Sequence, residues 1–270
     1  MPEKAANTEA METTRAFWNA NPCNAMDSLA VRRKYRYRSE PWLPGTIKRI
    51  AGLHKHVLEI GCGQGTDGLE FCANLPKDGS YIGIDYSDQS VESAKQALTE
   101  AGALNVTPTF RTGNAEALDF DDDSIECIFS FGVLHHTANP QVAFDEVYRV
   151  LKPGGRAYII LYRKWSPKVT AAKFLRAVQH VLDFVFRTER CLYKLVDGVH
   201  FETLLGTAVL ECFGVPYMGW YRAAEMRRMF SKFKIHDLYP VGYSLPWFHS
   251  DPSARGPFGY YQFIEVEKVA

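Results

Sequence analysis

The sequence has no excess of either charge. Its 270 residues include 31 lysines and arginines and 31 aspartates and glutamates, which gives a formal net charge of zero. A dedicated nucleic-acid-binding protein usually carries a basic excess that neutralises phosphates. We therefore expect no nucleic acid among the partners of this chain.

The chain also lacks the cysteine patterns of zinc sites and disulfide frameworks, and it lacks long apolar runs. None of the six cysteines forms a Cys-x-x-Cys pair or has a histidine at ligand spacing, so we expect reduced thiols and no bound metal. No run reaches the length needed to span a membrane, and residues 1–18 lack the apolar core of a signal peptide. These absences predict a soluble, cytoplasmic protein without stable membrane insertion.

Apolar residues are numerous enough for a sizeable core. They make up 46% of the sequence, which suffices for one large domain or one domain with an insertion. Between residues 57 and 162, short apolar runs alternate with helical patterns, which predicts a doubly wound, mainly parallel α/β sheet. The expected strands are 57–60, 80–85, 106–111, 124–131 and 156–162, and the expected helices between them are 66–75, 88–101 and 140–151.

The first strand leads into a glycine-rich turn. The run Val57-Leu58-Glu59-Ile60 is followed by glycines at every second position, Gly61, Gly63 and Gly65, and a helix can begin directly afterwards. Glycine allows a sharp turn and lets a ligand approach the backbone closely. A strand, a glycine turn and a helix N-terminus together indicate a nucleotide-binding site at the carboxyl edge of a sheet.

Polar residues follow the later strands at the same edge. Asp85 ends the second strand 24 residues after Gly61, close to the spacing of about 20 at which an acid meets a ribose in doubly wound folds. Asn114 follows the third strand, and His135 and His136 follow the fourth. Imidazole is the commonest general base, so either histidine is a candidate for catalysis, although either could instead hold a loop.

Taken in order, these stretches resemble the motifs of the class I S-adenosylmethionine-dependent methyltransferases. The G-x-G-x-G turn after a strand that contains Glu59 is similar to motif I of the family, and Val133-Leu134-His135-His136 is similar to the segment after strand four of many small-molecule methyltransferases. Other matching stretches are Gly83-Ile84-Asp85-Tyr86-Ser87, Gly113-Asn114-Ala115 and Leu151-Lys152-Pro153-Gly154-Gly155. The resemblance implies a Rossmann-like sheet of seven strands, with a sixth strand near 233–239 and an antiparallel last strand near 259–266.

The resemblance implies S-adenosyl-L-methionine as the cofactor and methyl transfer to a hydroxyl or nitrogen of a small molecule, of aromatic or apolar character. It assigns the glycine turn to the amino-acid end of the cofactor, Asp85 to the ribose, and Asn114 with Ala115 to the adenine. Glu59 orders either the turn or the cofactor ammonium. The predicted cofactor-binding residues are Glu59, Gly61, Cys62, Gly63, Gln64, Asp85, Tyr86, Asn114, Ala115 and Phe131, and the candidate catalytic residues are His135 and His136.

Two departures from the family pattern bear on this interpretation. Asn114 stands where the family usually has aspartate, and we expect its amide oxygen to bond the adenine amino group. Ser130-Phe131-Gly132-Val133 stands where methyltransferases of exocyclic base amino groups usually carry Asn-Pro-Pro-Tyr. That difference and the neutral charge disfavour methylation of RNA or protein. A cofactor-binding scaffold without catalysis is a further alternative, which the presence of Gly61, Gly63, Asp85 and the histidine pair disfavours.

The flanking segments predict a division into four parts: an N-terminal helical lid segment (1–45), a cofactor-binding core (46–162), a helical insertion that caps the acceptor (163–220) and a C-terminal completion of the sheet (221–270). Residues 1–12 look frayed, with a short helix over 13–18. A basic stretch at 29–38 predicts either a solvated helix face or a phosphate-binding patch.

Two of these segments leave alternatives open. The long helical pattern in the insertion has an apolar stripe and a basic bias, so a second subunit, as in a homodimer, or a membrane surface competes with packing on the sheet. The aromatic residues of the first segment either dock a helix on the core or form a lid. The cluster Tyr243, Trp247, Phe248 and His249 either lines an acceptor pocket or makes an oligomer contact.

Overall fold

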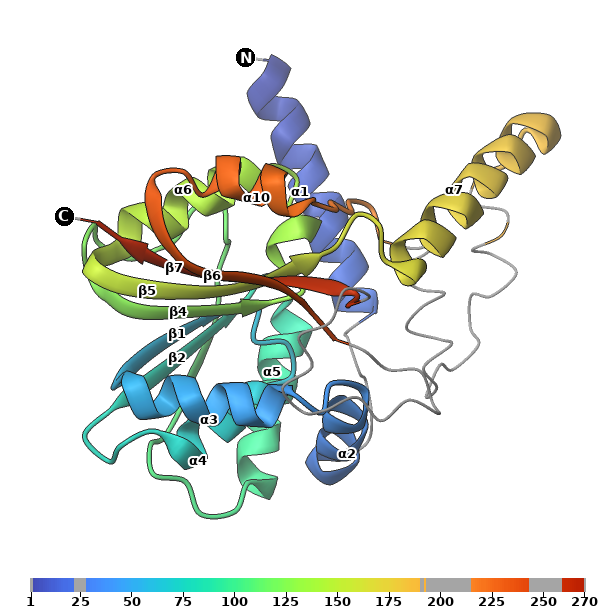
Figure 1. Ribbon diagram of the computed structural model, residues 1–270. Coiled ribbons are helices and arrows are strands. Elements are labelled where there is room, and N and C mark those ends of the chain that lie inside the picture. The colour runs from blue at the N-terminus through green and yellow to red at the C-terminus, as the bar shows by residue number, and fades with distance from the viewer. Residues whose placement is uncertain (1, 22–27, 190–191, 193–214, 243–258, 270) are drawn as a thin grey trace.

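A seven-stranded sheet forms the centre of the computed structural model, which describes residues 2–21, 28–189, 192, 215–242 and 259–269 (Figure 1). The strand order is β3-β2-β1-β4-β5-β7-β6. The neighbours among β1 to β5 are parallel, whereas β7 runs antiparallel between β5 and β6. The strands are β1 (His56–Ile60), β2 (Ser80–Asp85), β3 (Thr109–Thr112), β4 (Ile125–Phe131), β5 (Leu151–Tyr162), β6 (Phe233–Val241) and β7 (Tyr261–Lys268).

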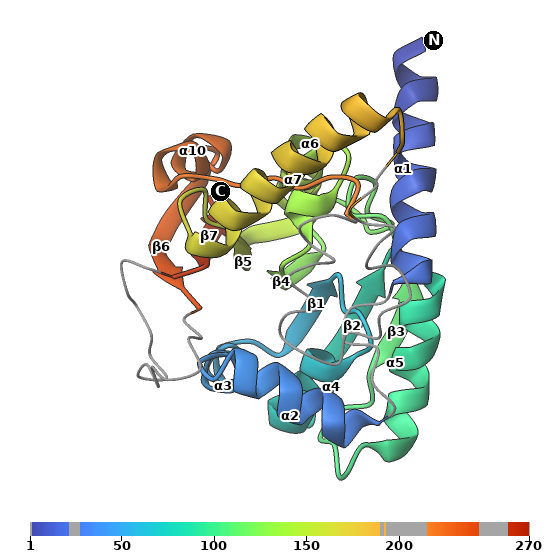
Figure 2. The same ribbon diagram turned by 90° about the vertical axis from the view of Figure 1, so that its right-hand side faces the viewer.

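Helices cover both faces of the sheet. Apolar side chains of α3, α4 and α5 form one core cluster with the sheet, and those of α6 and α10 form a second cluster on the other face (Figures 1 and 2). A short 3-10 turn, η1 (Leu134–His136), follows β4. The helices are α1 (Pro2–Ala20), α2 (Leu29–Ser39), α3 (Leu43–Leu53), α4 (Thr66–Asn74), α5 (Asp88–Glu100), α6 (Pro140–Val150), α7 (Pro167–Phe186) and α10 (Ala223–Met229).

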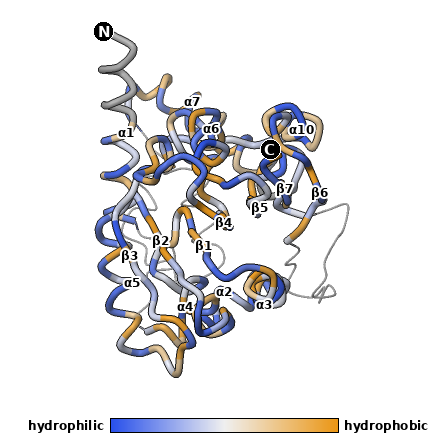
Figure 3. The backbone as a smooth tube through the Cα atoms, turned by 90° about the vertical axis from the view of Figure 1, so that its left-hand side faces the viewer, coloured by the Kyte–Doolittle hydropathy of each residue, from blue (hydrophilic) through white to orange (hydrophobic). Residues whose placement is uncertain are grey.

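The central strands are apolar because both of their faces are covered. Successive side chains of a strand point to opposite faces, so Ile128 joins the cluster under α6 and α10, while Phe129 joins the cluster under α3 and α4. Figure 3 shows this as long hydrophobic stretches on the central strands, whereas the helices alternate between hydrophobic and hydrophilic residues. This near-continuous apolar character is typical of parallel strands buried on both sides.

The predicted doubly wound sheet is confirmed, with differences at the strand ends. β3 begins at Thr109, three residues later than expected. β5 begins at Leu151, five residues earlier than expected, because Leu151 already pairs with Ile125 before a shift in register. The predicted sixth strand and the antiparallel last strand are present as β6 and β7.

The N-terminal helix is longer than predicted. α1 begins at Pro2, whereas the sequence analysis expected a frayed segment and a helix only from Thr13. Residues 1–12 include three alanines, three glutamates and two methionines, which are strong helix formers, so the polarity of this segment did not signal disorder. α2 begins at Leu29, where the side chain of Ser28 accepts a hydrogen bond from the backbone N–H of Val31.

The insertion that the sequence predicts at 163–220 is described only in part. Its long helix is α7, which projects away from the sheet in Figure 1. Val169 is buried near the start of α7, and Leu175, Val178 and Leu182 are half-buried. Val185 and Phe186 are 62% and 66% exposed, so among the described residues the burial of the predicted apolar stripe decreases along the helix. None of the helices in the described ranges is long and apolar enough to cross a membrane. The cluster from Tyr243 to His249 lies outside the described residues.

We predict that the core around β4 dominates stability. Phe129 is fully buried and its ring meets Phe71 edge-on at 5.2 Å between centroids, so Phe129→Ala should lower the free energy of unfolding by about 3–5 kcal/mol. Phe184 on α7 is 86% exposed, and Phe184→Ala is therefore a matched control that should cost less than about 1 kcal/mol. Urea denaturation measures both values, and equal losses would contradict this description of the core.

Candidate active site

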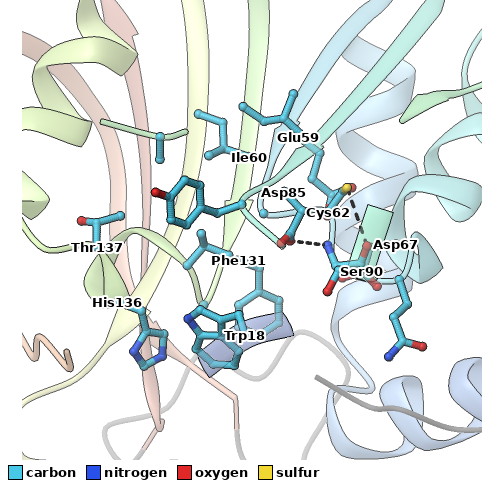
Figure 4. Close-up of a pocket in the computed structure, with 18 of the residues that line it drawn as sticks. Trp18, Glu59, Ile60, Cys62, Asp67, Asp85, Ser90, Phe131, His136 and Thr137 are labelled. Carbon is cyan, nitrogen blue, oxygen red and sulfur yellow. Dashed lines mark hydrogen bonds between the residues drawn. The ribbon is translucent and has the colours of Figure 1, made fainter. Parts of the chain in front are cut away.

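A cavity of about 460 Å³ lies at the carboxyl edge of the sheet, where β1, β2 and β4 end (Figure 4). Its wall includes all ten predicted cofactor-binding residues and one of the two candidate catalytic residues, His136. Helices α1 and α2, which belong to the predicted lid segment, contribute further wall residues, among them Trp18 and Tyr35. The fold therefore brings the predicted site residues together, with the exception of His135.

The glycine turn borders this cavity with its backbone. Gly61 has φ +80°, and a Cβ at this position would lie 2.1 Å from the Val133 side chain, so no larger residue fits. Gly63 has φ +51°, which also favours glycine, and no atom lies within 4 Å of the place a Cβ would take. A ligand can therefore approach the backbone of Gly63 closely.

Asp85 ties the end of β2 to this turn. One carboxylate oxygen accepts a hydrogen bond from the backbone N–H of Gly63 at 2.8 Å, and the other accepts from the N–H of Ser87 at 2.9 Å. Burial raises the pKa of Asp85, whereas these N–H groups favour the ionised form and oppose the shift. The carboxylate thus holds the turn and faces the cavity at the same time (Figure 4).

Glu59 lies in β1 directly before the turn and is almost completely buried. The hydroxyl of Tyr81 donates a hydrogen bond to its carboxyl group. Burial raises the pKa of Glu59 to about 8, and the nearby negative charge of Asp67 adds to the rise, while the Tyr81 bond and the positive charge of Arg36 oppose it. The Glu59 carboxyl group is therefore mainly neutral at pH 7.

Three arginines hold α2 against the glycine turn and α4. Arg36 also lies over the ring of Phe131, with its guanidinium carbon 4.3 Å from the ring centroid, and it forms part of the cavity wall. The basic stretch at 29–38 is therefore not simply a solvated helix face. The pairs are Arg32–Gln64 at 2.6 Å, Arg33–Glu70 at 2.7 Å and Arg36–Asp67 at 2.6 Å.

α1 forms another wall of the cavity through Trp18. Arg15 pairs with Asp88 at 2.5 Å, and the hydroxyl of Ser87 donates to the side-chain oxygen of Asn19 at 2.8 Å, so α1 is fixed to the N-terminal end of α5. The Trp18 ring lines the cavity and meets the ring of His136 at 5.5 Å between centroids. Whether these contacts open and close as a lid stays a prediction.

The two histidines of η1 have different surroundings. The His135 side chain is fully buried and does not line the cavity. The centroid of its ring lies 4.1 Å from the centroid of the Tyr162 ring. His136 lines the cavity, and its Nδ1 lies 2.8 Å from the backbone carbonyl oxygen of Tyr217. A carbonyl oxygen only accepts hydrogen bonds, so Nδ1 carries the hydrogen and the neutral ring has its lone pair on Nε2. The backbone N–H of Gly219 donates to the His135 carbonyl at 2.6 Å, which also fixes this turn.

The loop after β3 adds an acid that the sequence analysis missed. The side-chain oxygen of Asn114 accepts a hydrogen bond from the backbone N–H of Glu116 at 2.9 Å. Oε1 of Glu116 in turn accepts a hydrogen bond from the backbone N–H of Asn139 at 2.7 Å. The second carboxylate oxygen, Oε2, is buried and has no hydrogen-bond partner among the residues that the structure describes. Both Asn114 and Glu116 line the cavity.

The cavity wall also includes a cysteine, Cys62. Burial raises the pKa of the Cys62 thiol well above its usual value, so this thiol stays protonated and is a poor nucleophile. In the part of the chain that the structure describes, no three histidine, cysteine, aspartate or glutamate side chains are arranged to hold a metal ion.

Residues 53–205 match a family model described as a methyltransferase domain. The chain therefore belongs to this family, and its domain is a class I S-adenosylmethionine-dependent methyltransferase domain. An S-adenosylmethionine-dependent methyltransferase from Aquifex aeolicus superposes on 90% of this chain and 100% of its own, with a TM-score of 0.54. The two sequences are 16% identical, so this likeness concerns the fold alone.

Two curated relatives give the closer comparison in sequence. The chain is 33% identical over 120 residues to a demethylmenaquinone methyltransferase from Lactococcus lactis, which covers 44% of this chain and 47% of the relative. It is 35% identical over 160 residues to a ubiquinone/menaquinone biosynthesis C-methyltransferase from Geotalea daltonii, with 55% and 65% covered. The chain thus spans about half to two thirds of the length of these relatives.

The raised pKa of Glu59 predicts a specific dependence of stability on pH. Between the usual glutamate value near 4.5 and about 8, the folded protein binds the Glu59 proton and the unfolded chain does not. Glu59 therefore lowers the free energy of unfolding as pH rises through this window, by up to about 1.4 kcal/mol per pH unit. Glu59→Gln removes this contribution, so the variant should become more stable relative to the parent between pH 5.5 and 8. Denaturation across this range measures the difference, and parallel profiles would contradict the assignment.

Proposed function

We propose that this chain transfers a methyl group from S-adenosyl-L-methionine to a small-molecule acceptor. The cavity fits the cofactor in two respects: a glycine backbone that a ligand can approach, and a carboxylate at the end of β2. In the proposal, the glycine turn and Glu59 hold the amino-acid end, Asp85 holds the ribose hydroxyls, and the loop after β3 holds the adenine. When bound, the cofactor supplies an electrophilic methyl group whose departure leaves a neutral thioether.

We infer that the acceptor is a flat aromatic molecule that binds on the side of the cavity that His136 and Trp18 line. His136 stands on this side with Trp18, away from Asp67 and Ser90 on the other side (Figure 4). Flat side chains in contact with one another give a preformed surface for stacking an aromatic ring. The neighbouring ring pairs are Trp18–His136 at 5.5 Å, His136–Tyr162 at 5.6 Å, Tyr162–Tyr261 at 5.4 Å and Tyr261–Phe131 at 4.8 Å.

His136 is the group that we assign as general base. The observation that carries this assignment is the 2.8 Å contact from Nδ1 to the Tyr217 carbonyl, because it leaves the basic lone pair on Nε2 of a ring that lines the cavity. Nε2 takes the proton of the acceptor hydroxyl while the oxygen–carbon bond forms and the carbon–sulfur bond breaks. We assign His135 to holding the turn.

The methylated atom has two candidates on a hydroxyl-bearing aromatic ring. Removal of the hydroxyl proton makes the oxygen nucleophilic, and in a phenol it also makes the neighbouring ring carbons nucleophilic. Oxygen is our first candidate, and the name of the Geotalea daltonii relative, a C-methyltransferase, favours ring carbon as the second. A nitrogen acceptor fits less well, because a neutral amine needs no base. His136 would then have no role in the reaction.

The insertion contributes to the site through its last described residues. The Tyr217 carbonyl orients His136, and the N–H of Gly219 donates a hydrogen bond to the backbone carbonyl of His135 at 2.6 Å. We therefore assign residues 163–220 to positioning the base as well as to capping the acceptor.

The first prediction from this proposal concerns the donor. Asp85→Asn should weaken binding of S-adenosylhomocysteine by about 1.5–3 kcal/mol, because hydrogen bonds to a charged carboxylate are replaced by bonds to a neutral amide. Asp78 is exposed and remote from the cavity, so Asp78→Asn is the control and should bind normally. Calorimetry measures both affinities, and an unchanged affinity in Asp85→Asn would refute this location of the ribose.

The second prediction concerns the chemical step. His136→Gln should lower the turnover rate by about 10²–10⁴, the usual effect of removing a general base, and should leave cofactor affinity nearly unchanged. His236 lies on β6 outside the cavity wall, so His236→Gln should keep the parental rate. The measurement is formation of S-adenosylhomocysteine with a panel of hydroxyl-bearing aromatic acceptors.

The same assay separates the alternatives. Full activity of His136→Gln would exclude histidine as the base, and product analysis distinguishes methylation of oxygen from methylation of carbon. A non-catalytic scaffold predicts cofactor binding with no S-adenosylhomocysteine from any acceptor.

A further inference from the structure

One face of α7 carries exposed apolar side chains, which we call the outer face: Phe174, Val181, Phe184 and Val185. Phe174 precedes Val181 by seven residues, and Phe184 and Val185 follow it by three and four, so all four share one side of the helix. The buried residues Val169 and Ala172 lie on the opposite side, and α7 projects away from the sheet (Figure 1). Exposed apolar side chains that gather on one face mark a surface that binds another molecule.

Positive charges border the outer face. Lys173 directly precedes Phe174, and Arg187 follows Lys173 by fourteen residues, which is about four turns, so both lie on the same flank of the helix. Asp183 is the only acid in the sequence of α7, against three basic residues. The chemistry of this surface is therefore apolar and cationic.

An exposed tryptophan stands at the start of the helix. Trp165 is 62% exposed, and the Lys173 ammonium and the Arg222 guanidinium lie over its ring, 5.4 and 5.3 Å from the ring centroid. Tryptophan is enriched where an apolar phase meets water, because it joins a large apolar ring to a polar N–H group. The outer face thus begins beside a residue type that is typical of membrane interfaces.

The cations around Trp165 repel one another. Burial lowers the pKa of Lys173, and the positive charges of Lys164 and Arg222 lower it further. Glu225 opposes this shift, but its carboxylate also pairs with Lys164 at 3.3 Å. A negatively charged surface next to α7 would relieve the repulsion.

Charge also distinguishes a lipid surface from a second copy of the chain. Two copies joined through their outer faces would bring two cationic flanks together, and the apolar contact would have to offset that repulsion. An anionic membrane surface instead takes up the apolar side chains and attracts the cations beside them. A membrane is therefore the occupant that the whole surface fits.

We propose that α7 docks this protein on an anionic membrane, with its outer face at the boundary of headgroups and acyl chains and with Lys173, Arg187 and Arg222 at the lipid phosphates. The helix lies in the plane of the surface, and no helix in the described part of the chain is long and apolar enough to cross the bilayer. The inference goes beyond the proposed function, since none of the described side chains of α7 belongs to the cavity wall.

The test is sedimentation of the full chain with vesicles of phosphatidylglycerol and phosphatidylcholine in equal parts. Each lysine or arginine near an anionic surface raises the affinity by about fivefold. Binding should therefore be at least about 10-fold weaker on vesicles of phosphatidylcholine alone, and added salt should weaken binding to the anionic vesicles.

A double variant, Phe174→Ser with Phe184→Ser, removes both aromatic rings from the outer face. It should bind anionic vesicles at least about 10-fold more weakly, because burial of one phenylalanine side chain already contributes that factor. Leu53→Ser is the matched control. Leu53 is also mostly exposed, but it ends α3 just before the start of β1, at the amino edge of the sheet, whereas α7 follows the carboxyl end of β5.

The outcomes separate the possible occupants. Weaker vesicle binding by the double variant, with parental binding by Leu53→Ser and parental stability of both, supports the inference. Absence of vesicle binding by the parent, or equal binding by the parent and the double variant, overturns it. Analytical ultracentrifugation without lipid that finds a dimeric parent and a monomeric double variant would assign the outer face to a second copy. A marked loss of stability in the double variant would assign it to contacts within the chain, and either result overturns the inference.

Discussion

The hydrogen bond between the Asp85 carboxylate and the Gly63 N–H is the contact on which the cavity depends. It joins the end of β2 to the turn that follows β1, at 2.8 Å. The two strands are parallel neighbours, with Ile60 opposite Ile84, so both chain segments leave the sheet at the same edge. The backbone of the glycine turn therefore faces a space that side chains from β4, α1 and α2 then enclose (Figure 4).

The enclosed space is rich in acids. Glu59, Asp67, Asp85 and Glu116 line it, and of these Asp67 is paired with Arg36. Burial raises the pKa of both Glu59 and Asp85, which means that the cavity disfavours their negative charges unless another group compensates them. A cationic ligand with several donor groups offers that compensation. Within the proposed function, the cavity is matched in charge to a sulfonium cofactor with an ammonium group and an adenine amino group.

The sequence predicted what depends on local pattern. The glycine spacing, the acid at Asp85 and the alternation of apolar runs each need only neighbouring residues to be recognised, and the sheet and the cavity wall agree with them. The positions of Trp18 and Arg36 in the cavity wall could not be found in this way, because contacts between distant segments bring these side chains to the cavity. The difference between His135 and His136 likewise depends on the carbonyl of Tyr217, 81 residues away. The length of α1 has another cause, because its first residues are polar and yet have high helix propensity.

The central claim is that this cavity binds the cofactor with the ribose on Asp85. A crystal structure of the complex with S-adenosylhomocysteine tests it most directly. The account predicts the ribose hydroxyls within hydrogen-bond distance of the Asp85 carboxylate, the amino acid at the glycine turn, and the sulfur facing the side of the cavity that His136 lines. A nucleoside bound elsewhere on the protein, or one bound in this cavity with the ribose away from Asp85, would contradict it.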